Sequence, residues 1–114
     1  MLSIDTLRQF GANTQEGLGR CMNNEAFYLR LVNMALDDAN FGRLEQAVKD
    51  GDKKAAFEAA HALKGVLANL ALTPLCRPVS EMTELLRADE DADYPALLAE
   101  LLSLREALAA KRGS

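Results

Sequence analysis

The residues best suited to chemistry lie in one short segment, Ala60-His61-Ala62-Leu63-Lys64-Gly65. His61 is the only histidine among the 114 residues. A neutral imidazole is a good nucleophile, and a free imidazole is mostly neutral near pH 7. Attack on a phosphoryl group also requires access and charge neutralisation. Gly65 removes a side chain one helical turn from His61 and Lys64 supplies a cation, so the segment suits phosphoryl transfer through nitrogen.

The helix expected around His61 turns this residue toward solvent. At about 100° per residue, the apolar side chains gather within about 60° of a direction opposite His61. They are Ala56, Ala59, Ala60, Leu63, Val66, Leu67 and Leu70. The residues on the His61 side are Lys54, Phe57, Glu58, Lys64, Gly65 and Ala68. The pattern predicts one buried face and one exposed face, with His61 at the centre of the exposed one.

This exposed face also offers a surface to a partner. A glycine inside a helix costs about 1 kcal/mol relative to alanine, and close approach of another protein would offset that cost. Phe57 can anchor a partner, because aromatic residues are enriched at binding hot spots; cover by the N-terminal segment is the alternative. We expect partner docking at Phe57, Glu58, Ala68 and Lys54.

Composition narrows the class of protein. Apolar residues make up 49% of the chain, enough for the core of one domain. The net charge is −4, and no basic cluster stands out beyond Lys111-Arg112, which argues against nucleic-acid binding. Neither a membrane-spanning run nor a signal peptide is recognisable. Cys21 and Cys76 lack metal-ligand spacing, which argues against a structural zinc site and favours reduced thiols in a cytoplasmic protein.

Capping residues and glycines mark the expected ends of helices. The expected helices cover about 3–11, 13–19, 24–51 with a break near Asn40, 52–70, 73–88 and 93–108. Thr73 is expected to cap its helix through the hydroxyl, with Pro74 in the first helical position. Pro78 is expected to bend that helix or to delay its start.

Four substantial amphipathic helices joined by short connections predict an all-α, antiparallel four-helix bundle. We assign residues 1–23 to a short N-terminal helical segment that packs across one end. Residues 24–112 form the bundle, and the whole chain is expected to be a single domain.

The segment from His61 to Gly65 resembles the signature of histidine-containing phosphotransfer (HPt) domains, which is His-x-Leu-Lys-Gly. Asn69-Leu70 and Gly51-Asp52 are also similar to that family, and the resemblance covers about 24–108. The family usually has a small residue six positions after the histidine and a glycine ten positions after it. This chain has Leu67 and Ala71 there, which are expected to alter packing and the end of the helix rather than transfer.

The resemblance implies a phosphorelay phosphocarrier of a two-component system rather than an enzyme. His61 would accept a phosphoryl group from the aspartate of a response-regulator receiver domain and pass it to another receiver. Lys64 would support the phosphoryl charge, and Gly65 would give the receiver room. The resemblance implies no cofactor or metal on this chain, with Mg²⁺ held by the receiver. We expect a monomer that binds receiver domains and a hybrid sensor histidine kinase, but neither nucleic acid nor membrane.

Other interpretations stay open. The chain can be an HPt module of a larger hybrid sensor histidine kinase, although a first residue of Met1 favours a stand-alone protein. It can also be a non-catalytic helical adaptor that docks through the face from Phe57 to Ala68. A dimerising histidine kinase core is a third candidate, but the Glu/Arg/Pro context typical of such helices does not follow His61.

Overall fold

The computed structural model describes residues 1–113, and within this range it contains seven α-helices, one short 3-10 helix and no strand. The predicted all-α fold is confirmed. The helices are α1 (Ile4–Phe10), α2 (Thr14–Arg20), α3 (Glu25–Leu36), α4 (Asn40–Asp50), α5 (Lys53–Asn69), α6 (Thr73–Arg87), α7 (Tyr94–Ala109) and η1 (Ala110–Gly113). None of them is both long enough and apolar enough to span a membrane.

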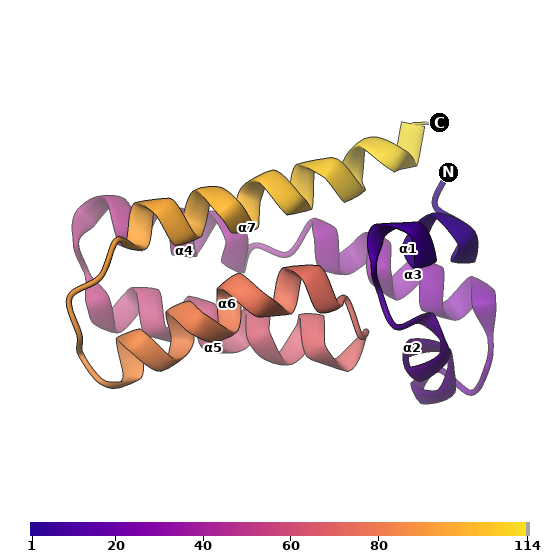
Figure 1. Ribbon diagram of the computed structural model, residues 1–114, viewed down its shortest axis with the longest axis horizontal. Coiled ribbons are helices and arrows are strands. Elements are labelled where there is room, and N and C mark those ends of the chain that lie inside the picture. The colour runs from indigo at the N-terminus through magenta and orange to yellow at the C-terminus, as the bar shows by residue number, and fades with distance from the viewer. Residues whose placement is uncertain (114) are drawn as a thin grey trace.

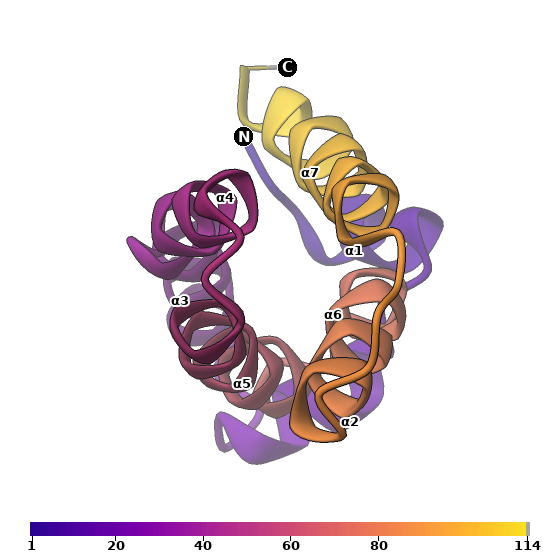
Figure 2. The same cartoon turned by 90° about the vertical axis from the view of Figure 1, so that its left-hand side faces the viewer.

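The bundle has four helical members that surround the core (Figure 2). Three of them are α5, α6 and α7, and the fourth consists of α3 followed by α4. The break between α3 and α4 lies near Asn40, as the sequence predicted. α1 and α2 lie at one end of the molecule, beside α3 (Figure 1). Met1 meets η1 at that same end, where its amino group donates to the carbonyl oxygen of Lys111 at 3.4 Å.

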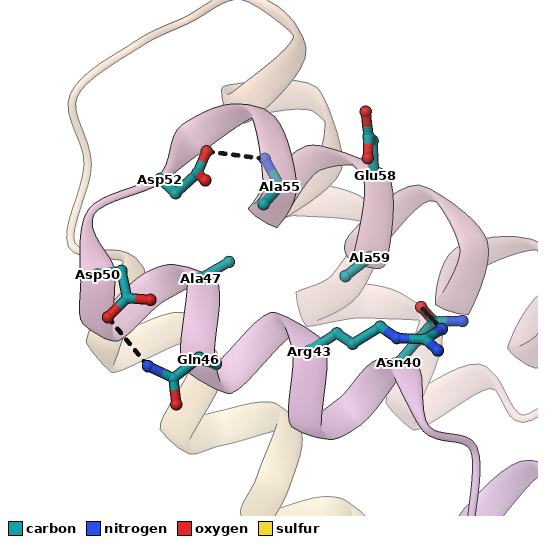
Figure 3. Close-up of a pocket in the computed structure, with 9 residues that line it drawn as sticks. All are labelled: Asn40, Arg43, Gln46, Ala47, Asp50, Asp52, Ala55, Glu58 and Ala59. Carbon is teal, nitrogen blue, oxygen red and sulfur yellow. Dashed lines mark hydrogen bonds between the residues drawn. The ribbon is translucent and has the colours of Figure 1, made fainter.

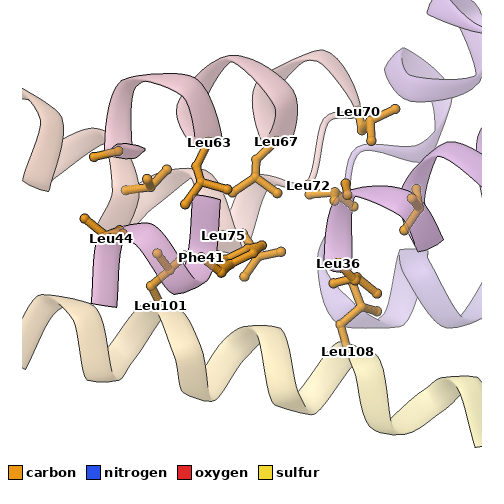
Figure 4. Close-up of a cluster of buried hydrophobic side chains, with 14 of the residues drawn as sticks. Leu36, Phe41, Leu44, Leu63, Leu67, Leu70, Leu72, Leu75, Leu101 and Leu108 are labelled. Atoms are coloured by element: carbon orange, nitrogen blue, oxygen red, sulfur yellow. The ribbon is translucent and has the colours of Figure 1, made fainter. Parts of the chain in front are cut away.

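Leucines from all four members of the bundle fill the interior. Figure 4 shows Leu63 and Leu67 pointing from α5 toward the side chains of α4, α6 and α7. The largest fully buried side chains are Tyr28, Leu7, Leu36, Leu44, Leu63, Leu67, Leu72, Leu75, Met82, Leu101, Leu108 and Val32. Leu67 therefore affects packing, as its position on the apolar face predicted, and the departure from the family pattern lies inside the core.

Two turns fix the ends of α5. Gly51 ends α4 in the left-handed conformation, with φ of 69°, and the carboxylate of Asp52 then accepts the amide of Ala55 at 3.0 Å (Figure 3). At the other end, Ala71 is left-handed with φ of 56°, and the amide of Leu72 donates to Leu67 at 3.0 Å. This turn is a Schellman motif, whose left-handed position favours glycine. Ala71 therefore occupies the position of the usual family glycine without moving the predicted end of the helix.

The start of α6 differs from the prediction. Thr73 is the first helical residue, whereas Leu72 occupies the cap position and makes no side-chain cap bond. The hydroxyl of Thr73 instead donates to the carbonyl of Ala71 at 3.3 Å, so the preceding turn uses it. Pro74 is consequently the second residue, where a helix still needs no amide donor. Pro78 is buried inside α6 and does not delay its start.

The N-terminal helices hold the C-terminal end of α5. The hydroxyl of Tyr28, on α3, donates to the carbonyl of Leu70 at 2.7 Å. The guanidinium of Arg20, on α2, donates to the carbonyl of Ala68 at 2.6 Å. The carbonyl of Ala68 also accepts the amide of Ala71 at 3.0 Å, so the guanidinium is a second donor to it. The last carbonyl groups of a helix need partners from outside it, and the hydroxyl of Tyr28 is such a partner for Leu70. The segment before the bundle is thus joined to the helix that carries His61.

The ring of Tyr28 makes α2 sensitive to one methyl group. A Cβ atom at Gly17 would lie 2.5 Å from the Tyr28 hydroxyl oxygen, whereas one at Gly19 would meet nothing within 4 Å. Overpacking of this kind costs about 1–3 kcal/mol, and alanine gains up to about 1 kcal/mol over glycine in a helix. We expect Gly17→Ala to lower the free energy of unfolding and Gly19→Ala to leave it unchanged or raise it. Urea unfolding followed by circular dichroism measures both, and equal effects would contradict the contact.

Tyr28 also gives stability a dependence on alkaline pH. Burial, with a smaller contribution from Cys21, raises its pKa from 10.0 to about 12. The folded state then keeps a phenol proton that the unfolded chain loses above pH 10. The contribution to stability is complete below pH 10 and is lost as the pH rises toward 12, by at most about 1.4 kcal/mol per pH unit.

Tyr28→Phe should therefore be less stable than the wild type at pH 8, by about 1 kcal/mol for the lost hydrogen bond. The difference should shrink as the pH rises to 11. Urea unfolding across this range measures it, and Tyr94→Phe, at the other tyrosine of the chain, is the control. Tyr94 is only half-buried and should show a smaller change. A difference between Tyr28→Phe and the wild type that stays constant with pH would refute the assignment.

Candidate functional site

His61 lies in the middle of α5 and is exposed to solvent. The residues that flank it on the buried face, Ala60 and Leu63, are fully buried. Because one helical turn carries both kinds of residue, packing of the apolar face against α4 and α6 directs the imidazole outward. The histidine is therefore accessible to a second molecule along its exposed side.

The surface beside His61 is open at Gly65. A Cβ atom at this exposed position would meet no other atom within 4 Å. The fold thus has no internal packing reason for a glycine here, although glycine in a helix costs about 1 kcal/mol. This absence of contact separates Gly65 from Gly17, whose missing side chain accommodates the Tyr28 ring. The space beside His61 is available to a partner.

On the side facing α6, an aromatic ring packs against His61. The rings of Phe57 and His61 are inclined by 12°, with their centroids 5.6 Å apart. The guanidinium carbon of Arg87, on α6, lies 5.2 Å from the centroid of the Phe57 ring. Phe57 is half-buried by these neighbours. Cover by the N-terminal segment, the alternative drawn from the sequence, is wrong because α6 supplies the covering residue.

Lys64, the cation next to His61 in the sequence pattern, also contacts a side chain of α6. The ammonium of Lys64 donates to Glu84 at 3.4 Å, and the other oxygen of Glu84 accepts from Nε of Arg87 at 3.1 Å. Arg87, with a smaller contribution from Lys64, holds the pKa of the Glu84 carboxyl below its usual value. Glu84 is therefore ionised at neutral pH and links the two cations. Contacts between exposed charges are weak, so Lys64 can exchange this partner for another anion.

The remaining predicted docking residues, Lys54, Glu58 and Ala68, are all exposed. Glu58 lies on the α4 side of α5, where it borders a polar groove (Figure 3). The groove is also lined by Asn40, Arg43, Gln46, Ala47, Asp50, Asp52, Ala55 and Ala59. The predicted residues consequently form two groups. Phe57 and Lys64 make contacts toward α6, whereas Glu58 faces α4.

Sequence reasoning missed Glu84 and Arg87. Their spacing of three residues predicts neighbours on one face of α6, and that was the only signal in the sequence. The pairing of this face with Phe57 and Lys64 depends on how α6 packs against α5, which the spacing does not encode. Within residues 1–113, no three His, Cys, Asp or Glu side chains are grouped as metal ligands.

Comparison with known proteins identifies the family. The family model of the Hpt domain matches residues 31–111, a span that includes α4, α5, α6 and α7 in full. Neither a curated protein nor a solved structure matches the chain. The Hpt match begins inside α3, so α1 and α2 lie outside it. Because the matched region is most of the chain and contains the exposed histidine, this protein belongs to the Hpt domain family, the phosphocarriers that carry out histidine phosphotransfer with receiver domains in two-component phosphorelays.

Proposed function

We propose that His61 is the residue that carries the phosphoryl group, which it accepts from the aspartyl phosphate of one receiver domain and passes to the aspartate of another. The observation that carries this proposal is an exposed imidazole beside a glycine with open space above it. It is the only histidine of the chain, so histidine phosphotransfer has one candidate residue.

The transfer requires one bond to form as another breaks. A ring nitrogen of His61 attacks the phosphorus of the aspartyl phosphate, and a nitrogen–phosphorus bond forms. The bond between phosphorus and the carboxylate oxygen breaks, and its electron pair leaves with the aspartate. Delivery to the second receiver is the reverse reaction. Both steps need the two reactants held in line, which is chiefly a matter of positioning and charge stabilisation.

Lys64 can stabilise the transferred group. Lys64 is three residues, about one helical turn, from His61, and the bond of its ammonium to Glu84 is long, at 3.4 Å. An incoming phosphoryl group offers a stronger anionic partner, since hydrogen bonds to phosphate oxygens are charge-assisted. Glu84 would keep its ion pair with Arg87 after Lys64 moves. We infer that Lys64 leaves Glu84 for the phosphoryl oxygens when His61 is phosphorylated.

The receiver has more room on the Gly65 side of His61. Phe57 and Lys64 occupy the flank toward α6, whereas Gly65 and Glu58 lie on the flank toward α4, beside the polar groove. We propose that a receiver covers Gly65 and Ala68 and brings the Mg²⁺ site with it, that a hybrid sensor histidine kinase acts upstream, and that the protein works as a monomer.

Replacing the histidine tests the central assignment. Wild-type protein incubated with a phosphorylated receiver should gain phosphate that is labile in acid and stable in base, as a phosphoramidate is. His61→Gln should gain none, because no other histidine is present. Mass spectrometry of the intact protein measures the added phosphate. Transfer that persists in His61→Gln would disprove the assignment, and receiver binding without any transfer in the wild type would favour a non-catalytic adaptor.

Replacing the glycine tests the direction of approach. Gly65→Gln should slow transfer from the receiver by about tenfold or more, because the added side chain would keep the aspartyl phosphate from its in-line position at His61. The free energy of unfolding should stay the same or rise, because glutamine favours a helix more than glycine does. Gly42→Gln is the matched control, because Gly42 is also an exposed helical glycine without atoms near a Cβ but lies on α4. Stopped-flow or quench-flow transfer assays measure the rates. A wild-type rate in Gly65→Gln would show that no partner comes close there.

A further inference from the structure

We propose that Phe57, held by Arg87, is a positioning residue that fixes the plane of the His61 imidazole for phosphoryl transfer. The inference rests on the proposed role of His61 and deepens it. It gives Phe57 a role inside this protein, in place of the docking role that its position on an exposed face predicts. It also gives α6 a part in a site whose sequence signature lies wholly on α5.

The geometry is that of an offset stack. The two rings are inclined by only 12°, and their centroids are 5.6 Å apart. Parallel rings in face-to-face contact would be separated by about 3.5 Å, so this pair is displaced sideways. Offset stacking is one of the arrangements that aromatic pairs prefer. The Phe57 ring therefore lies beside the imidazole, and His61 remains exposed to solvent.

An exposed histidine needs such a restraint in order to react efficiently. The torsion that turns an imidazole about its own axis has broad minima, and exposed side chains change rotamer within nanoseconds. In-line attack requires the lone pair of one nitrogen to point at phosphorus, and misalignment is costly in rate. A stacked neighbour that favours one ring plane raises the fraction of molecules ready to react.

Arg87 keeps Phe57 in place from the neighbouring helix. Its guanidinium carbon is 5.2 Å from the Phe57 centroid, within the range of a cation–π contact. Its Nε donates to Glu84 at 3.1 Å, which orients the guanidinium group along α6. Phe57 thus contacts both the imidazole of His61 and the guanidinium of Arg87. The imidazole is thus joined to α6 by successive contacts, from His61 to Phe57, from Phe57 to Arg87 and from Arg87 to Glu84.

The test compares Phe57→Leu with Phe57→Tyr. Leucine keeps an apolar side chain of similar reach but has no ring, whereas tyrosine keeps the ring. We expect Phe57→Leu to lower the maximal transfer rate at saturating phosphorylated receiver by about fivefold to tenfold, with less than a twofold change in KM. Phe57→Tyr should restore most of the rate. Arg87→Gln should lower the maximal rate by about twofold to threefold, since the ring remains.

A second measurement reports on the ring itself. The relaxation of the His61 imidazole carbons and nitrogens can be recorded by NMR in the unphosphorylated protein, where the single histidine makes assignment unambiguous. We expect a more mobile imidazole in Phe57→Leu and in Arg87→Gln than in the wild type. Arg77→Gln is the control, because Arg77 is an exposed arginine on α6 that contacts neither ring. Urea unfolding confirms that each variant is folded.

The outcomes separate the two proposals. If KM alone rises in Phe57→Leu, Phe57 is a docking anchor and the positioning role is wrong. An imidazole that is equally ordered with and without the Phe57 ring also overturns it. If wild-type His61 takes no phosphate from the receiver, the proposed function itself fails and the positioning role falls with it. Normal transfer in the wild type together with unchanged maximal rates in all variants refutes the positioning role alone.

Discussion

The packing of α5 is the constraint on which the rest of the structure depends. This helix buries alanines and leucines on one face while it carries the exposed His61 on the other. The small side chains of Ala56, Ala59 and Ala60 are buried, and their size lets neighbouring helices approach closely. Leu63 and Leu67 then fill the interior (Figure 4). Any rotation of α5 that brought His61 inward would expose this apolar face, so burial of the core determines the direction of the imidazole.

The rotation of α5 about its own axis is only one part of the placement of His61. The ends of α5 must also be fixed. At its start, the left-handed Gly51 and the capping Asp52 separate α5 from α4 within two residues. At its end, donors from α2 and α3 bind carbonyl groups of Ala68 and Leu70. The segment outside the Hpt match is therefore not a separate appendage. It supplies hydrogen-bond donors to the end of the helix that carries His61.

The sequence allowed the fold to be predicted well because its signals are local. Asp52, Gly51 and the period of the apolar residues define α5 without any knowledge of its neighbours. The predicted capping role of Thr73 was wrong. A hydroxyl can cap the next helix or bond to the preceding turn, and here it bonds to the carbonyl of the left-handed Ala71. The same limit applies to the site. His61 and its exposed face can be predicted from helical spacing. The contact of Glu84 with Lys64 depends on how α6 packs against α5, which the spacing does not encode.

The position of Glu84 and Arg87 also explains why the two sides of His61 differ. Both residues come from α6, and they contact Phe57 and Lys64 on one flank of His61. Gly65, on the other flank, faces open space. A phosphocarrier must hold its imidazole steady and yet leave it accessible, and a single surface cannot be both covered and open. Dividing the requirements between two flanks of one helix satisfies both, because α6 restrains the ring from one side and the other side is left to the partner.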